Sequence, residues 1–167
     1  MQYFNVNSSK GNLIKGPLII KPKIFLDNRG YFFESWNHSE FNKIISREVT
    51  FVQDNHSESK FGILRGLHYQ LDPYSEGKTL SCLNGRIFDI VVDLRQESET
   101  FMQWFSIELS KENRKSIHIA PGCANAFLTM ELNSLIHYYC SQPYIPEAER
   151  GIRYDDPAFD FKWPHAP

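Results

Sequence analysis

The sequence has few cysteines, and those present do not form a recognisable set. Cys82, Cys123 and Cys140 are odd in number, lie far apart and include no CxxC pair. Disulfide-rich domains and structural zinc sites have paired cysteines at characteristic spacings. We therefore expect neither a disulfide framework nor a zinc knot, and we expect a reducing, cytoplasmic location.

Long apolar runs and an excess of one charge are also missing. The first twenty residues have no apolar run of signal-peptide length, and no later run approaches the length of a membrane span. The 18 Lys and Arg residues and 20 Asp and Glu residues give a formal net charge of −2, with no basic cluster. We expect no membrane and no nucleic-acid partner, so any anionic ligand must be bound by a few well-placed cations.

Aromatic residues in short β-type runs are what the sequence has in abundance. It contains 13 Phe, 8 Tyr and 3 Trp in 167 residues, a composition that favours strands and aromatic-lined pockets. Turn-forming residues separate the runs, and Asn84-Gly85 is the sharpest hairpin signal among them. This spacing predicts an all-β sandwich or barrel formed by a single domain, residues 1–167.

The sequence also predicts the local structure of two further segments, a helix and the C-terminal tail. One short helix is predicted at about residues 39–47, with Asn37 or Ser39 as its N-terminal cap and apolar residues on one face. The last stretch, residues 155–167, is rich in proline and turn formers, so we expect an irregular tail over the surface.

The run GRIFDIVVDLR at residues 85–95 combines acids with apolar residues. Strand alternation places Asp89 and Asp93 on one face and only apolar residues on the other. If the apolar face packs between sheets, the acids look into a barrel interior, where an unpaired carboxylate needs a partner. Arg65, His68 and Lys78 are the nearest candidates; alternatively, the acids cap a turn or pair at the surface.

His68 lies in another apolar run and has a plausible chemical neighbour. Lys78 follows ten residues later across a turn, so a hairpin would bring the two side chains together. A nearby ammonium favours the neutral imidazole that a general base needs, and Tyr138 or Tyr139 could donate a proton. The alternative is a hydrogen-bonded structural histidine.

A metal at His68 is not supported by the spacing. A metal-binding β-barrel usually has HxH, then a carboxylate and a later histidine, but Gln70 stands two residues after His68 and Asn125 stands in the later strand. Glu76 alone cannot complete such a site, and no ligand spacing joins His118 or His137 to His68. We therefore expect no metal and no cofactor.

Arg65 and His68 can share a site only if the strand bends. They are three residues apart, so regular alternation would place their side chains on opposite faces. Gly66 between them is the residue that would permit a local bend.

Several long segments, in order and at matching spacing, resemble the dTDP-4-dehydrorhamnose 3,5-epimerase family of nucleotide-sugar epimerases. The resemblance extends from about residue 16 to residue 164. The matching segments are residues 27–35 (DNRGYFFES), 51–57 (FVQDNHS), 64–70 (LRGLHYQ), 77–78 (GK), 89–95 (DIVVDLR), 121–122 (PG) and 149–152 (ERGI).

The resemblance implies a cupin-type jelly roll with one or two short helices, acting without metal. It also implies a homodimer whose N-terminal strands cross to the partner. In the family, the histidine matching His68 removes the proton next to the C4 ketone of a nucleotide-linked 4-keto-6-deoxy sugar. The lysine matching Lys78 stabilises the enolate oxygen, and the tyrosine matching Tyr138 delivers a proton from the other face.

Binding residues follow from the same resemblance. Arg65 and Arg29 match contacts to the diphosphate and sugar, with Arg29 reaching the neighbouring subunit's site, and a guanidinium can bond two phosphate oxygens at once. Tyr144 matches the aromatic residue that stacks on the base. Further binding positions are matched by Glu34, Gln53, Asn55 and Glu149; taken alone, most of these residues would be interpreted as turn, edge or rim residues.

The sequence departs from the family pattern in two places. Asn125 stands where the family usually has a histidine that touches the substrate, and an amide cannot carry a proton or a positive charge. The family usually continues into a tail whose aspartate orients the catalytic histidine, whereas this sequence stops at Pro167. Asp89 is our candidate for the orienting carboxylate, with Asp93 as the alternative.

The leading hypothesis is a cofactor-independent epimerase of a nucleoside-diphosphate 4-keto sugar that inverts C3, C5 or both, in a pathway to a modified surface sugar. The alternatives are a single-site epimerase or ketoisomerase on the same fold, or a non-catalytic nucleotide-sugar binding module. A stacking tyrosine accepts any base, so the nucleotide stays open.

Overall fold

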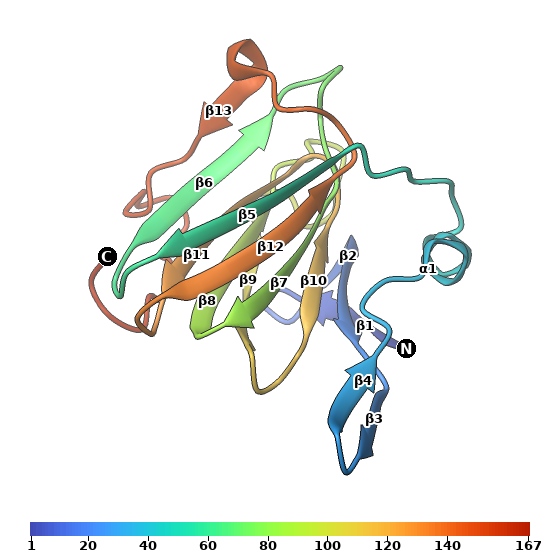
Figure 1. The fold of residues 1–167 in the computed structure, drawn as a ribbon. Helices are drawn as coiled ribbons and strands as arrows, with labels where there is room; N and C mark the ends of the chain where they lie inside the picture. The colour runs from blue at the N-terminus through green and yellow to red at the C-terminus, as the bar shows by residue number, and fades with distance from the viewer.

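The computed structural model describes residues 1–167, and two antiparallel sheets face each other in it (Figure 1). The larger sheet has the strand order β1 (Gln2–Asn7), β2 (Leu13–Lys21), β10 (Ser116–Ile119), β7 (Lys78–Asn84), β12 (Ser134–Cys140) and β5 (Gln53–Ser59). The smaller sheet has the order β13 (Glu149–Gly151), β6 (Leu64–Gln70), β11 (Cys123–Thr129), β8 (Arg86–Asp93) and β9 (Trp104–Ser110). The strand spacing correctly predicted an all-β fold, and the arrangement is the cupin-type jelly roll that the resemblance implied.

The helices are few and short. α1 runs from His38 to Ile45, close to the predicted span, and the Asn37 side chain accepts a hydrogen bond from the Glu40 backbone N–H at 2.9 Å, which confirms Asn37 as the cap. η1 (Pro146–Ala148) is a single turn before β13. No helix has both the length and the apolar character needed to cross a membrane.

The main core lies between the two sheets. Leu80, Ile117 and Ile136 from the larger sheet pack with Ile87 and Val91 from the smaller one, all almost fully buried. Because Ile87 and Val91 share a face of β8 with the acids, the acid-bearing face looks into the barrel interior, as predicted.

The other face of β8 does not pack between the sheets, and that part of the expectation was wrong. Ile90 and Val92 point outward and are covered by Phe159, Phe161 and Trp163 of the C-terminal segment. This segment has no helix or strand after Gly151, so the prediction of an irregular tail is confirmed. Its aromatic side chains close a second, smaller core.

The predicted hairpin at Asn84-Gly85 was also wrong. β7 and β8 do meet at this turn, but β7 pairs with β10 and β12, whereas β8 pairs with β9 and β11. The turn therefore takes the chain from one sheet to the other. A tight turn specifies only a change in chain direction, and the two strands that flank it pair with strands from elsewhere in the sequence.

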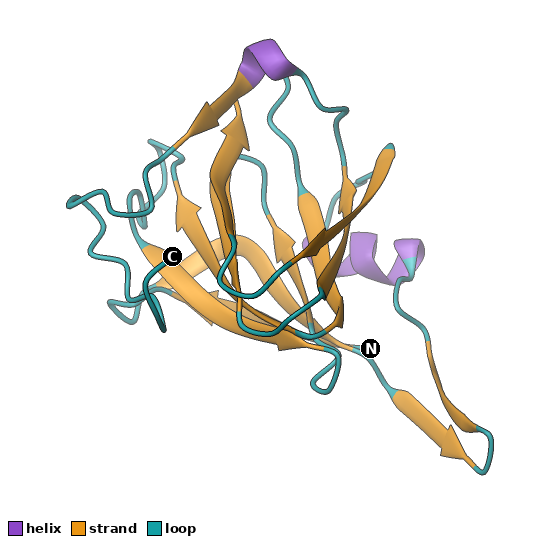
Figure 2. Cartoon of the chain, turned by 60° about the vertical axis from the view of Figure 1, so that its left-hand side comes forward, coloured by secondary structure: helices purple, strands orange, loops and turns teal.

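One hairpin leaves the barrel. β3 (Ile24–Asp27) and β4 (Gly30–Phe33) pair only with each other, and Figures 1 and 2 show them projecting away from the sheets. Phe25, Leu26 and Phe32 are 51%, 79% and 69% exposed on it. An isolated two-stranded hairpin with exposed apolar side chains is expected to need a further packing partner.

Candidate active site

A cavity opens into the space between the two sheets. It consists of two adjoining hollows of about 320 and about 470 Å³, and His68, Lys78 and Tyr138 line both. The other lining residues singled out in the sequence are Gln53, Asn55, Tyr144 and Glu149 in the first hollow and Arg65 and Asn125 in the second.

Arg65 and His68 reach the same hollow because β6 bulges between them. On β11, Phe127 and Asn125 are two residues apart, yet they pair with Arg65 and His68, which are three apart. Gly66 lies in the bulge with φ of 101°, and a Cβ there would be 2.3 Å from the Asn125 backbone oxygen. The predicted bend at Gly66 is therefore confirmed, and only glycine fits it.

His68 and Lys78 are neighbours for a different reason from the one predicted. β6 and β7 belong to facing sheets, so no hairpin joins them, and the two side chains approach each other across the interior. Lys78 Nζ lies 2.7 Å from Glu76 Oε1, and both side chains are largely buried. Sequence reasoning assigned Glu76 no role in positioning Lys78, although the two residues are near neighbours in the chain.

Tyr138 presents its phenol to the cavity from β12. Burial raises the pKa of Tyr138, and the nearby Lys78 ammonium offsets part of that increase. The phenol therefore keeps its proton at neutral pH and is suited to donating it.

The carboxylate beside His68 is that of Glu149. Glu149 Oε1 lies 3.8 Å from His68 Nδ1, and the other oxygen, Oε2, accepts a 2.7 Å hydrogen bond from the Tyr144 hydroxyl. The Tyr144 backbone N–H donates to Gln53 Oε1 at 2.9 Å, and the Gln53 amide donates to Asn55 Oδ1 at 3.0 Å. A chain of contacts thus links His68 to the ring of Tyr144.

Asp89 is fully buried behind the cavity and contacts a different residue. The Asn125 amide donates to both Asp89 carboxyl oxygens at 2.9 Å. Burial raises the pKa of Asp89 to about 8, against the opposing effects of the Asn125 hydrogen bonds and the Lys78 charge. Asp89 makes no hydrogen bond to His68, and Asp93 is bound by the Arg95 guanidinium, Ser98 and Thr100.

Gln70 has a supporting role that the sequence analysis missed. Its side chain is buried, its amide donates to the Tyr74 and Pro143 carbonyls, and its oxygen accepts from the Ile145 N–H at 2.7 Å. These bonds fix the loop that presents Tyr144. The available signal was strand alternation, which places Gln70 on the same side as His68.

Arg29 and Glu34 are not at this cavity. Arg29 is at the tip of the β3–β4 hairpin, where its 85% exposed side chain bonds Asp27 at 2.6 Å. Glu34 follows β4 and accepts a hydrogen bond from the Asn37 amide. Within one chain, the predicted site is therefore present without these two residues.

Comparison with known proteins agrees with the fold. A family model described as dTDP-4-dehydrorhamnose 3,5-epimerase matches residues 12–167. The dTDP-4-dehydrorhamnose 3,5-epimerase of Salmonella typhimurium is 45% identical over 147 residues, which cover 88% of this chain and 80% of that protein.

Two solved structures are similar over most of their length. A Legionella pneumophila dTDP-6-deoxy-D-glucose-3,5-epimerase in complex with dTDP-4-keto-L-rhamnose has a TM-score of 0.88 and 39% identity, covering 98% of this chain and 84% of that one. A 3′-monoepimerase from Streptomyces bikiniensis in complex with dTDP-quinovose has a TM-score of 0.86 and 30% identity, covering 90% and 76%. The chain therefore belongs to the dTDP-4-dehydrorhamnose 3,5-epimerase family and is an isomerase of the epimerase class.

Proposed function

We propose that the protein inverts C3, C5 or both of a dTDP-linked 4-keto-6-deoxy sugar through an enolate, without a cofactor. The observation that supports this most directly is that His68, Lys78 and Tyr138 line both hollows of one cavity. The substrate class is supported by relatives named dTDP-4-dehydrorhamnose 3,5-epimerase and by one bound to dTDP-4-keto-L-rhamnose.

In the proposed reaction, His68 removes the proton from the carbon next to the ketone, and the C–H electron pair forms the enolate. The Lys78 ammonium stabilises the negative charge that develops on the ketone oxygen. Tyr138 donates its phenolic proton to the same carbon from the opposite face, so the configuration inverts and the ketone re-forms. Proton exchange with solvent restores His68 and Tyr138.

Nucleotide binding follows from the residues around the cavity mouth. Tyr144 is 52% exposed; its backbone N–H donates to Gln53 and its hydroxyl donates to Glu149, so a base can stack on a fixed ring. Arg65 uses its Nε to bond Ser59 at 2.9 Å, which leaves its two terminal nitrogens for the diphosphate.

The remaining predicted residues fit a homodimer. We propose that the single domain pairs with a second copy so that the β3–β4 hairpin of one chain crosses to the cavity of the other. The exposed apolar side chains of the hairpin would be covered there, and Arg29 and Glu34 would approach the bound sugar nucleotide. We also propose a cytoplasmic location for this enzyme.

Hydrogen exchange tests the proposed function directly. Wild-type protein and His68→Asn are incubated with a dTDP-4-keto-6-deoxy sugar in deuterated water, and deuterium at C3 and C5 is measured by NMR. We expect incorporation with wild type and a loss of about a hundredfold or more with His68→Asn. His38→Asn, an exposed histidine on α1, is the matched control; equal exchange in wild type and His68→Asn would sink the proposal.

Inversion at a single carbon is the second candidate, because a relative with 30% identity is a 3′-monoepimerase. Asn125, which bonds Asp89 at the wall of the second hollow, is where this chain departs from the usual histidine. Product stereochemistry distinguishes the two cases: a product inverted only at C3 shows a monoepimerase, and inversion at both carbons excludes it.

A further inference from the structure

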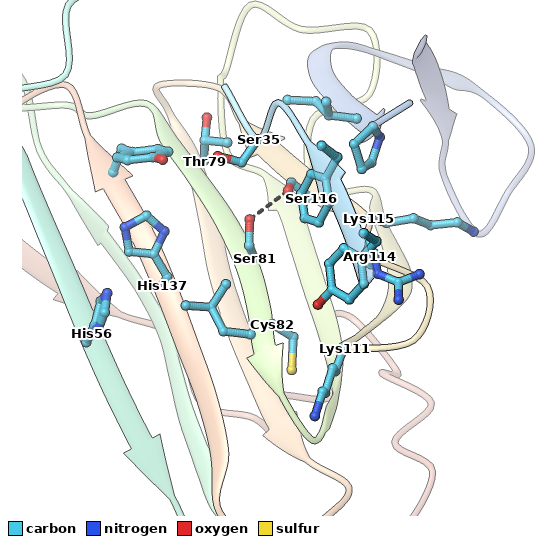
Figure 3. Close-up of a pocket in the computed structure, with 16 residues that line it drawn as sticks. Ser35, His56, Thr79, Ser81, Cys82, Lys111, Arg114, Lys115, Ser116 and His137 are labelled. Atoms are coloured by element: carbon cyan, nitrogen blue, oxygen red, sulfur yellow. Dashed lines mark hydrogen bonds between the residues drawn. The ribbon is translucent and has the colours of Figure 1, made fainter. Parts of the chain in front are cut away.

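Three metal-ligand side chains converge on the outer face of the larger sheet. Asp54 and His56 are two residues apart on β5, so both point outward, and His137 on β12 is paired directly with His56. Figure 3 shows His56 and His137 projecting from neighbouring strands at one end of a cavity of about 330 Å³. The convergence is a direct product of strand alternation and register.

The donor atoms are close enough to bind one ion. One ligand atom from each of Asp54, His56 and His137 lies within 4.8 Å of the other two. The centroids of the two imidazole rings are 5.0 Å apart, and the rings are perpendicular. The Tyr139 ring packs edge-on against the His137 ring, with 4.7 Å between their centroids. His137 is thus held in place by packing, and its Nε2 lies 2.5 Å from Asp54 Oδ1.

We propose that Asp54, His56 and His137 form a site for a divalent cation of the Zn²⁺ type. Two imidazole nitrogens and one carboxylate oxygen are donors that Zn²⁺ accepts, and three protein ligands leave one position for water. A tetrahedral ion at about 2.1 Å from each donor needs donors about 3.4 Å apart. The Asp54 side chain is 60% exposed and is free to rotate by the small amount required.

This cation site is separate from the reaction cavity. Asn55 and Tyr138 alternate with the ligand residues and point inward, where they line the cavity. The sheet therefore lies between the two sites, and the site adds to the proposed function without altering its metal-free chemistry.

Calorimetric titration of chelator-treated protein with ZnCl₂ tests the proposal. We expect one Zn²⁺ per wild-type chain and binding weakened by about tenfold or more in His56→Gln and in His137→Gln. We also expect Zn²⁺ to raise the melting temperature of wild type but not of these variants. Circular dichroism establishes that each variant is folded.

Two controls locate the ion. His38→Gln changes an exposed histidine outside the cluster and should bind Zn²⁺ as wild type does. His68→Asn, in the reaction cavity, should also bind normally. Absence of Zn²⁺ binding to wild type, or affinity in His56→Gln and His137→Gln equal to that of wild type, would overturn the proposal. Loss of binding in His68→Asn would also overturn it, because the ion would then lie in the reaction cavity.

Discussion

At the scale of single residues, the two carboxyl groups nearest the site differ in burial and in the residues they contact. Asp89 is fully buried and bonds an uncharged amide, so its pKa is raised to about 8. Glu149 is partly exposed and lies between His68 and Tyr144. The two carboxyl groups therefore have different contacts: Asp89 accepts hydrogen bonds from Asn125 in the wall, and Glu149 lies beside His68, where we propose that it orients the base of the proposed reaction.

The raised pKa of Asp89 makes stability depend on pH. Between about pH 4 and about pH 8 the folded protein keeps a proton on Asp89 that the unfolded chain releases, so this contribution is complete below about pH 4 and is lost as the pH rises to about 8. Asp89→Asn does not titrate. We expect the stability of wild type relative to Asp89→Asn to fall by at most about 1.4 kcal/mol per pH unit in this range.

Urea unfolding at several values between pH 4 and pH 9 measures this difference. Asp160→Asn removes a well-exposed carboxylate paired only with Lys162, and its stability should parallel that of wild type. If the free energies of unfolding of wild type and Asp89→Asn changed with pH in parallel, the raised pKa of Asp89 would be contradicted.

Glu149→Gln tests the contact with His68. The substitution keeps the shape and the hydrogen bond from Tyr144 but removes the negative charge beside the imidazole. We expect kcat to fall by about tenfold or more, with a smaller change in KM, because the base is less well oriented. Glu147→Gln, an exposed acid in the preceding turn, should behave as wild type; a rise in KM alone would assign Glu149 to substrate binding instead.

At the scale of the secondary-structure element, β6 determines the geometry of the site. Its bulge brings Arg65 and His68 to one side, and its neighbour β13 places Glu149 opposite Gln70. A regular β6 would direct Arg65 and His68 to opposite faces of the sheet.

The Gly66→Ala substitution is therefore expected to destabilise the folded protein strongly. An added Cβ would meet the Asn125 oxygen and the Ala126 backbone, which cannot move as a flexible side chain can. We expect a loss of about 3 kcal/mol or more in the free energy of unfolding, measured by urea denaturation. Gly11→Ala separates the cost of the positive φ from the cost of the steric contact. Gly11 also has a positive φ, but no atom lies within 4 Å of the new Cβ. This substitution should therefore reduce the free energy of unfolding by only about 1 kcal/mol.

At the scale of the whole molecule, the residues predicted to bind substrate are divided between two places. The cavity lies between the sheets, whereas Arg29 is at the tip of a hairpin that projects from the barrel and Glu34 directly follows that hairpin (Figure 2). This separation is what a site shared between two copies would require.

Mixing two inactive variants tests the shared site. The Arg29→Ala and His68→Asn proteins are unfolded together and refolded, so that random pairing in the proposed dimer yields mixed dimers with one intact site and one doubly altered site. We expect roughly a quarter of wild-type activity to return. Arg29→Ala and His68→Asn refolded separately serve as controls, and no recovery on mixing would place Arg29 outside the partner's cavity.

Much of the fold and part of the site could be predicted from local patterns in the amino-acid sequence. Alternation in residues 85–95 correctly placed Asp89 in the interior, and the three-residue separation of Arg65 and His68 correctly required a bend at Gly66. The matching segments correctly indicated the family. Each of these features depends on side-chain period or on residue identity, which the sequence contains in full.

The choice of partners was decided only by the tertiary structure. Asn84-Gly85 specified a turn, yet the strands beside it joined different sheets, and Lys78 approached His68 across the barrel rather than along a hairpin. Asn125 became the partner of Asp89, and Glu149 became the neighbour of His68, because β11 and β13 pack beside residues distant in the chain. Local propensity determines where a strand runs and which way its side chains point, whereas pairing depends on burying one continuous core between residues that are far apart in sequence.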